Sequence, residues 1–201
     1  MNQIIKNTII LFVITLVAGI CLGTVHDITL DPIAQAQEAA ATKTYQEVYP
    51  DAASFDEPQE LADAVTAADS ISEWGFGKVT INDAKEALDA SGNQIGYLIT
   101  STSAESYGGN VQIAVGISNE GELTGIGFLS ISDTPGLGMR AKEPDFKDQF
   151  IGKKAENLEV TKTGASADNQ IEAISGATIT SKAVTNATDA AIYFVANCLA
   201  Q

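Results

Sequence analysis

The stretch that decides the fold is VQIAVGISNEGELTGIGFLSI, residues 111–131. Large apolar residues occur here at every second position, with smaller or polar residues between them, which is the period of a strand with one buried face. The first four are Val111, Ile113, Val115 and Ile117. Asn119-Glu120-Gly121 then supplies a turn before a second strand over 122–131. The stretch therefore predicts an antiparallel hairpin.

The same period of two continues on the N-terminal side of this hairpin. Strands are expected near 79–88 and 94–102, separated by the turn residues Ser91-Gly92-Asn93. The later elements expected are a helical segment over 143–150, short strands at 158–163 and 170–174, and a closing helix from about Thr180 to Leu199. An antiparallel sheet packed against helices is an α+β fold.

The closing helix has one apolar face at helical spacing. The residues on that face are Val184, Thr188, Ala191, Val195 and Leu199. We expect this face to cover the sheet.

The N-terminal region predicts one membrane-spanning helix. Nineteen residues pass without a charge between Asn7 and Val25, which is the length that one span requires. Lys6 precedes this run and Asp27 follows it, so the N-terminus is expected inside the cell and the rest of the chain outside. A cleaved signal peptide is the alternative, with Ala34-Gln35-Ala36 as its cleavage site. The length of the apolar run favours an anchor that stays in the mature protein.

The residues after the span predict a helical connector. Asp31-Pro32 resembles an N-cap followed by a first-turn proline, and an Ala- and Glu-rich run continues to about Val48. A short helix is expected near 60–68. The chain thus divides into a membrane anchor over 1–26, a helical connector over 27–75 and one domain over 76–201.

Composition excludes several classes of function. Eleven Lys and Arg against 26 Asp and Glu give a formal charge of −15, and every acidic residue lies beyond position 26. Such a body repels phosphate backbones, so we expect no nucleic-acid partner. The chain has two cysteines, Cys21 and Cys198, and one histidine, His26. These cannot make a zinc site, a cysteine-ligated iron–sulfur cluster or a His-based triad, and we expect neither a metal ligand nor a catalytic residue.

Ser175-Gly176-Ala177-Thr178-Ile179-Thr180-Ser181-Lys182 is the stretch with the most chemical content. Hydroxyls and small residues gather where a helix begins, and backbone N–H groups converge there with the positive end of the helix dipole. That combination suits a phosphate. Ser and Thr are also the preferred capping residues before a helix, and periodicity by itself favours this simpler explanation.

The Ser-Gly-Ala-Thr string followed by a helix resembles the flavinylation motif of membrane-anchored FMN-binding domains. In that family a flavin transferase joins the phosphate of FMN to the Thr of the motif through a phosphoester bond. The resemblance implies that Thr178 carries covalently attached FMN. A second match is Thr134-Pro135-Gly136-Leu137-Gly138, which resembles the loop beside the flavin in the same family, although an ordinary Pro-Gly turn explains it equally well.

The resemblance also implies the other residues of a flavin site. Ser175 and Ser181 would help to hold the phosphate, the glycines would allow a close approach, and Leu137 would contact the ring. The implied cofactor-binding residues are Thr178, Ser175, Gly176, Ala177, Ser181, Thr134, Gly136 and Leu137. One departure from the family pattern is Glu172, which stands where an Asp is usual and could reduce recognition by the transferase.

From about Gly96 onward the chain is similar to the G subunit of the Rnf electron-transport complex. The corresponding C subunit of the sodium-translocating NADH:quinone reductase shares the motif but is typically longer, so the length favours Rnf. The resemblance implies a relay for electrons passing from reduced ferredoxin to NAD⁺, coupled to sodium or proton movement, rather than an enzyme that acts alone. It also implies integral membrane subunits and iron–sulfur or flavin subunits as partners, and a single-pass location in the cell membrane with the domain on the outer face. Two further alternatives are an independent flavin-bearing surface reductase and a non-redox binding domain.

Overall fold

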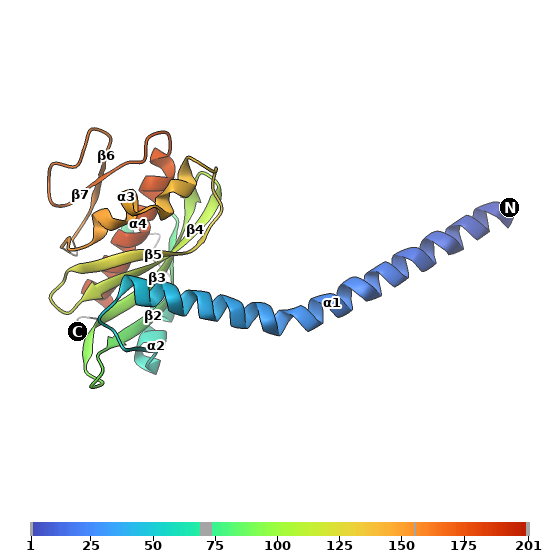
Figure 1. Ribbon diagram of the computed structural model, residues 1–201, viewed down its shortest axis with the longest axis horizontal. Helices are drawn as coiled ribbons and strands as arrows, with labels where there is room; N and C mark the ends of the chain where they lie inside the picture. The colour runs from blue at the N-terminus through green and yellow to red at the C-terminus, as the bar shows by residue number, and fades with distance from the viewer. Residues whose placement is uncertain (1, 69–73, 155, 200–201) are drawn as a thin grey trace. The chain divides into compact units, whose positions relative to one another are not determined.

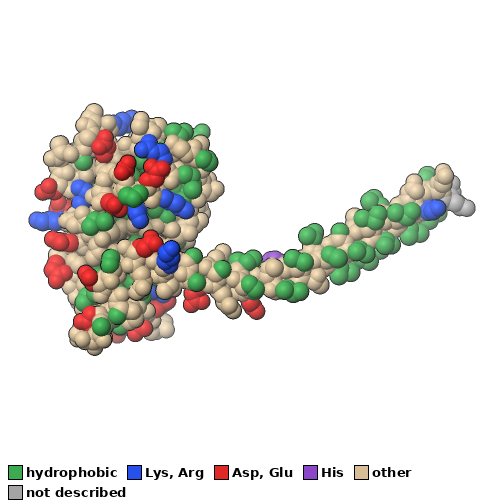
Figure 2. Space-filling model, in the orientation of Figure 1, with side chains coloured by type: hydrophobic (Ala, Val, Ile, Leu, Met, Phe, Trp, Pro, Cys, Tyr) green, Lys and Arg blue, Asp and Glu red, His purple; other side chains and the backbone are tan. Residues whose placement is uncertain are grey.

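The computed structural model describes residues 2–68, 74–154 and 156–199. It forms two compact units, residues 1–42 and residues 43–201. The first unit is helical and belongs to α1, Asn2–Val48. Its apolar side chains are exposed (Figure 2), and the helix is long and apolar enough to cross a membrane. This agrees with the predicted N-terminal anchor.

The connector helix does not begin at Asp31, as the sequence suggested. α1 passes through this point without interruption, and Pro32 lies inside it. Proline lacks an N–H group and therefore removes one helical hydrogen bond, but the bonds on either side of it persist. Figure 1 accordingly shows a helix that is bent part-way along its length rather than one that ends and starts again.

The second compact unit begins at Lys43, whereas the sequence analysis places the start of the domain at residue 76. Val48, Tyr49 and Ala52 are buried. The hydroxyl of Tyr49 donates to the carbonyl oxygen of Ile95 at 2.7 Å, and the hydroxyl of Thr124 donates to the carbonyl oxygen of Val48 at 2.7 Å. The last turn of α1 is therefore part of the body.

Two further elements of the supposed connector lie in the body as well. A short strand that the sequence analysis missed, β1 (Ser54–Asp56), pairs antiparallel with β2 (Val79–Leu88). The short helix predicted near 60–68 is present as α2 (Gln59–Ala67).

A five-stranded antiparallel sheet forms the centre of the body. Its strands follow one another in space in the order in which they occur in the chain, from β1 to β5. The remaining strands are β2 (Val79–Leu88), β3 (Gln94–Ser106), β4 (Gly109–Ser118) and β5 (Leu123–Ile131). The predicted hairpin is confirmed, since β4 pairs with β5 in a register that places Ile113 opposite Phe128.

The elements after the sheet are short until the final helix. They are η2 (Gly138–Lys142), α3 (Pro144–Lys147), η3 (Asp148–Phe150), the parallel strands β6 (Glu159–Thr161) and β7 (Gln170–Glu172), the helix α4 (Thr178–Phe194) and a π-helical turn η4 (Val195–Leu199). The fold is the predicted α+β class.

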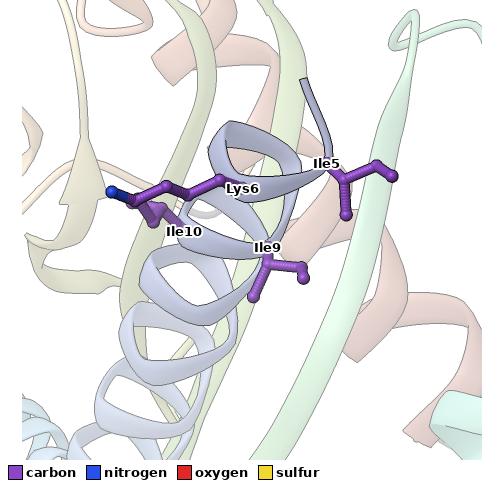
Figure 3. A pocket seen from close by; sticks show the side chains of 4 residues that line it. All are labelled: Ile5, Lys6, Ile9 and Ile10. Carbon is purple, nitrogen blue, oxygen red and sulfur yellow. The ribbon is translucent and has the colours of Figure 1, made fainter. Parts of the chain in front are cut away.

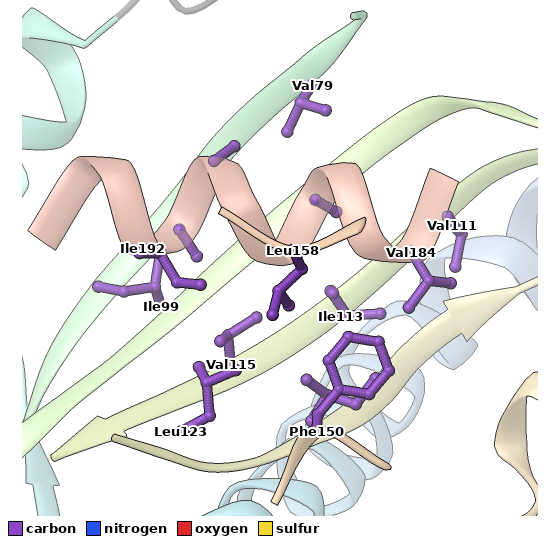
Figure 4. Close-up of a cluster of buried hydrophobic side chains, with 14 of the residues drawn as sticks. Val79, Ile99, Val111, Ile113, Val115, Leu123, Phe150, Leu158, Val184 and Ile192 are labelled. Carbon is purple, nitrogen blue, oxygen red and sulfur yellow. The ribbon is translucent and has the colours of Figure 1, made fainter. Parts of the chain in front are cut away.

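The main core lies between α4 and one face of the sheet (Figure 4). Ile99, Ile113 and Val115 of the sheet are fully buried together with Val184 of the helix. The predicted apolar face of α4 is too narrow, because Ala183, Ala187 and Ala190 are buried as well. The sheet packs on one side of the helix, and β6 and η2 also contact it, so small side chains are needed on several of its faces.

Candidate functional site

Thr178 is the first residue of α4 and is half-buried. The N-cap is Ala177, and within the described residues no side chain makes a capping hydrogen bond to this helix end. The capping explanation of the Ser/Thr-rich stretch therefore does not describe the helix. The first N–H groups of a helix have no acceptor within it, so this end combines available donors with the positive end of the dipole.

Gly176 and Leu137 bring the two sequence motifs together. Gly176 has φ +80°, and a Cβ atom added to it would lie 3.0 Å from Cδ2 of Leu137. Leu137 is 42% exposed and belongs to a tight loop, in which its N–H group donates to the carbonyl oxygen of Thr134 at 3.1 Å. Gly136, with φ +75°, permits that turn. The loop 134–138 thus lies against the residues that immediately precede Thr178.

The hydroxyl groups near this helix end differ in accessibility. Thr180 and Ser181 are fully buried. The Ser181 hydroxyl donates to the carbonyl oxygen of Ala177 at 3.0 Å and accepts from the N–H group of Ile174 at 3.0 Å. Ser175 is exposed. Ser181 thus supports the backbone of the motif, and its predicted contact with phosphate stays a prediction.

Asp133 is a functional candidate that the sequence analysis missed. Its Oδ2 atom accepts hydrogen bonds from the hydroxyls of Thr180 at 2.7 Å and Ser106 at 3.0 Å. Burial raises the pKa of Asp133, but hydrogen bonds from Thr180, Thr134, Ser106 and Gly108 outweigh it and hold the pKa below its usual value. The carboxylate is therefore ionised at neutral pH. Its place directly before the Thr-Pro-Gly-Leu-Gly loop was the available signal.

Charged and apolar side chains are exposed in the segments that adjoin Thr178 and Gly176. Lys182 is exposed and follows Thr178 by four residues, which places it on the same side of the helix. Leu137 and Ile179 offer exposed apolar surface, with Ile179 54% exposed. Glu172 is exposed at the end of β7, and its N–H group donates to Oε1 of Gln149 at 2.7 Å.

A second unusual carboxylate lies further along the same helix. Asp189 is 4% exposed, and its Oδ1 atom accepts a hydrogen bond from the N–H group of Leu158 at 2.9 Å. Burial raises the pKa of Asp189 to about 7, while the bond from Leu158 acts in the opposite direction. Among the described residues, no group of three His, Cys, Asp or Glu side chains could hold a metal ion.

A shallow hollow on α1 is unconnected with these residues. Figure 3 shows it between Ile5, Lys6, Ile9 and Ile10, which lie on two successive turns of the helix. The three isoleucines belong to the apolar surface of the candidate membrane helix. The hollow therefore reflects the spacing of side chains on a bare helix.

Two family models match separate regions of the chain. Residues 106–193 match the family model of the FMN-binding domain, and residues 1–48 match that of the RnfG N-terminal region. The first match spans both the 134–138 loop and the Thr178 motif.

Curated relatives extend the match over nearly the whole chain. The G subunit of the Na⁺-translocating ferredoxin:NAD⁺ oxidoreductase complex of Acetobacterium woodii is 36% identical over 96% of this chain and 92% of its own length. The chain belongs to the family of Rnf G subunits. Another member, the G subunit of the ion-translocating oxidoreductase complex of Methanosarcina acetivorans, is 31% identical over 96% of this chain and 95% of its own.

These G-subunit relatives differ in the ion that their names give. The Clostridium ljungdahlii relative, 30% identical over 95% of this chain and 91% of its own, is called proton-translocating. Among solved structures, the C subunit of the Na⁺-translocating NADH-quinone reductase from Parabacteroides distasonis aligns with a TM-score of 0.44 and 19% identity, over 71% of this chain and 95% of that chain. The family assignment rests on the G-subunit relatives.

Proposed function

We propose that this chain is the electron-carrying G subunit of an ion-translocating oxidoreductase, with FMN joined to the hydroxyl of Thr178 by a phosphoester bond. The observation that carries the proposal is the packing of Leu137 on Gly176, two residues before Thr178 and the uncapped start of α4. Both motifs lie inside the FMN-binding domain match. The names of the G-subunit relatives favour ferredoxin and NAD⁺ as the ends of the electron path.

The residues at this place fit a flavin phosphate. Thr178 supplies the hydroxyl, and the N–H groups of the first helical turn favour an anion. Gly176 and exposed Ser175 leave the approach open. A cation near a helix N-terminus is unfavourable unless an anion is present, and the exposed Lys182 one turn along then acquires a partner.

The same surface fits a flavin ring. Leu137 and Ile179 are the exposed apolar side chains next to the attachment residue, and contact with them would shield one part of the ring from water. FMN, when bound, supplies one- or two-electron transfer, while the protein holds it and sets its potential. The formal charge of −15 opposes additional negative charge on the cofactor and so lowers that potential.

The partners follow from the same proposal. The chain would receive and pass on electrons within a complex of integral membrane and iron–sulfur or flavin subunits, and a flavin transferase would attach its FMN. α1 would span the cell membrane once, with the body on the outer face because Lys6 lies before the apolar run and the acidic residues follow it. A chain of this kind oxidises no soluble substrate alone.

Production of the full chain together with a flavin transferase tests the proposal. The wild-type chain should carry the mass of one FMN and remain fluorescent after denaturing electrophoresis, and Thr178→Ala should lose both. Ser175→Ala is the sharpest control, because the Ser175 hydroxyl of the motif is exposed, and Thr180→Ala is the control for a buried one. Both controls should keep the covalent flavin.

Three outcomes would contradict the proposal in different ways. Covalent flavin that persists in Thr178→Ala would move the attachment site. A wild-type chain that never acquires flavin would favour a non-redox binding domain. Purification of a flavin-loaded chain that reduces a soluble acceptor without any other membrane subunit would favour an independent reductase.

A further inference from the structure

One carboxylate joins three segments beside the proposed attachment residue. Asp133 lies two residues after the end of β5, and its Oδ1 atom accepts from the N–H group of Thr134 at 2.6 Å. Its Oδ2 atom accepts from Ser106, at the end of β3, and from Thr180, in the first turn of α4. The β3–β4 hairpin, the 134–138 loop and the start of α4 are thus tied together through a single side chain.

The backbone around Asp133 leaves no space for other side chains. A Cβ atom on Gly138 would overlap the carboxylate of Asp133, and one on Gly108 would overlap the carbonyl oxygen of Ser132. Neither Gly108 nor Gly138 has a positive φ. Glycine is therefore required at both positions by the close approach of neighbouring atoms and not by the backbone conformation. Gly138 thus packs on the carboxylate from the loop side, and Gly108 packs on the backbone of Ser132 and Asp133 from the hairpin side.

The hydrogen bond from Thr180 to Asp133 lies on the side of α4 opposite to Thr178. Thr180 follows Thr178 by two residues, which is about 200° around a helix, so the two side chains point to opposite sides. Thr180 is fully buried, whereas Thr178 is half-buried. The hydrogen bond to Asp133 therefore holds the inner side of the first turn while the outer side stays free for a bound group.

We propose that Asp133 is a positioning residue that holds the 134–138 loop against the first turn of α4 and so fixes Leu137 next to Thr178. Its influence on the flavin rests on the proposed function, whereas its influence on the loop does not. A hydrogen bond to an ionised carboxylate is stronger than one between neutral groups, and a negative charge is favourable at a helix N-terminus. Both effects act here on one side chain.

Two isosteric variants of the full chain test this in detergent, after production with a flavin transferase. Asp133→Asn removes the charge, and Thr180→Val removes one donor while Asp133 stays in place. Thr188→Val is the matched control, because Thr188 is equally buried in α4 and its hydroxyl donates to the carbonyl oxygen of Val184. The first readout is hydrogen–deuterium exchange of peptides covering 132–139, and the second is the visible spectrum and midpoint potential of the flavin.

Both test variants should retain flavin on Thr178 but exchange the loop amides at least about tenfold faster, as expected from the loss of a charge-assisted hydrogen bond. Their flavin spectrum or midpoint potential should shift, whereas Thr188→Val should match the wild type in both readouts. If the wild type carries flavin and both variants match it in exchange, spectrum and potential, Asp133 is not a positioning residue. If the wild type carries no flavin, the proposed function fails, and the exchange rates of the unloaded chains still decide the role of Asp133 in the loop.

Discussion

Cδ2 of Leu137 lies 3.0 Å from the position that a Cβ atom on Gly176 would occupy. The two residues are 39 positions apart in sequence, yet this contact joins the loop after β5 to the turn before α4. Any side chain at position 176 therefore competes with Leu137 for space.

Gly176→Ala should destabilise the protein by about 1–3 kcal/mol, because it combines a left-handed backbone with this close contact. Gly121→Ala is the matched control, since Gly121 has φ +75° and nothing within 4 Å of its added Cβ atom. The control should lose only the free energy of unfolding that the left-handed backbone costs, about 1 kcal/mol. Urea unfolding of both variants measures the difference, and equal losses would show that Leu137 moves aside at no cost.

Gly136→Val should change the absorption spectrum of the attached flavin, because a branched residue cannot keep φ +75° and the 134–138 loop must shift. Gly92→Val places the same residue in another open turn with φ +80°, between β2 and β3. Its spectrum should equal that of the wild type. An unchanged spectrum in a folded Gly136→Val chain would leave this loop as an ordinary turn.

Because of Asp189, the free energy of unfolding should fall as the pH rises. Its pKa is about 7 in the folded protein, above the value in the unfolded chain, so the folded state binds the proton more tightly. The stabilisation is complete below the unfolded pKa and disappears as the pH passes through about 7. Asp189→Asn should remove this dependence, and the wild type should lose about 1–3 kcal/mol relative to it between about pH 5 and about pH 7.5.

Urea unfolding at several pH values measures that loss. Asp168→Asn is the control, because it removes an exposed carboxylate from the same body. Parallel pH curves for the wild type and Asp189→Asn would mean that the buried carboxylate keeps an ordinary pKa.

The mature chain should retain residues 7–25. Nineteen uncharged residues exceed the apolar core of a typical signal peptide, and the same stretch lies in the exposed apolar helix α1. Intact mass measurement of the purified chain should therefore include this segment, and alkaline carbonate should leave the chain in the membrane pellet. A mature N-terminus near Gln37 would instead identify a cleaved signal peptide.

The strands and the closing helix were predictable because each buries a face whose spacing is visible locally, as in Ile113 and Val115. The inclusion of residues 43–56 in the body could not be predicted from the sequence. The burial of Tyr49 depends on a hydrogen-bond acceptor 46 residues away, the carbonyl oxygen of Ile95. Pro32 misled the prediction because a local preference for the first turn of a helix was taken as the start of a new helix.

The candidate site could likewise be predicted only in part from the sequence. The motifs named Thr178 and Leu137, but their proximity depends on a contact between distant segments. The hydroxyl of Ser181 suits a phosphate contact by its chemistry, but in the structure it forms hydrogen bonds with the backbone of Ala177 and Ile174. The sequence pattern cannot distinguish these two roles. Asp133 was missed because its partners, Ser106 and Thr180, are 27 and 47 residues away.

The burial of α4 has a consequence for how far a group on Thr178 can travel. The turns that follow Thr178 contain Ala183, Val184 and Ala187, none more than 2% exposed, and such core segments open only with global unfolding. A flavin bonded to Thr178, as proposed, would thus be anchored to a core helix, unlike a group carried on a mobile loop. Its range would be set by its own rotatable bonds, so delivery of an electron to a more distant acceptor would require the whole body to dock.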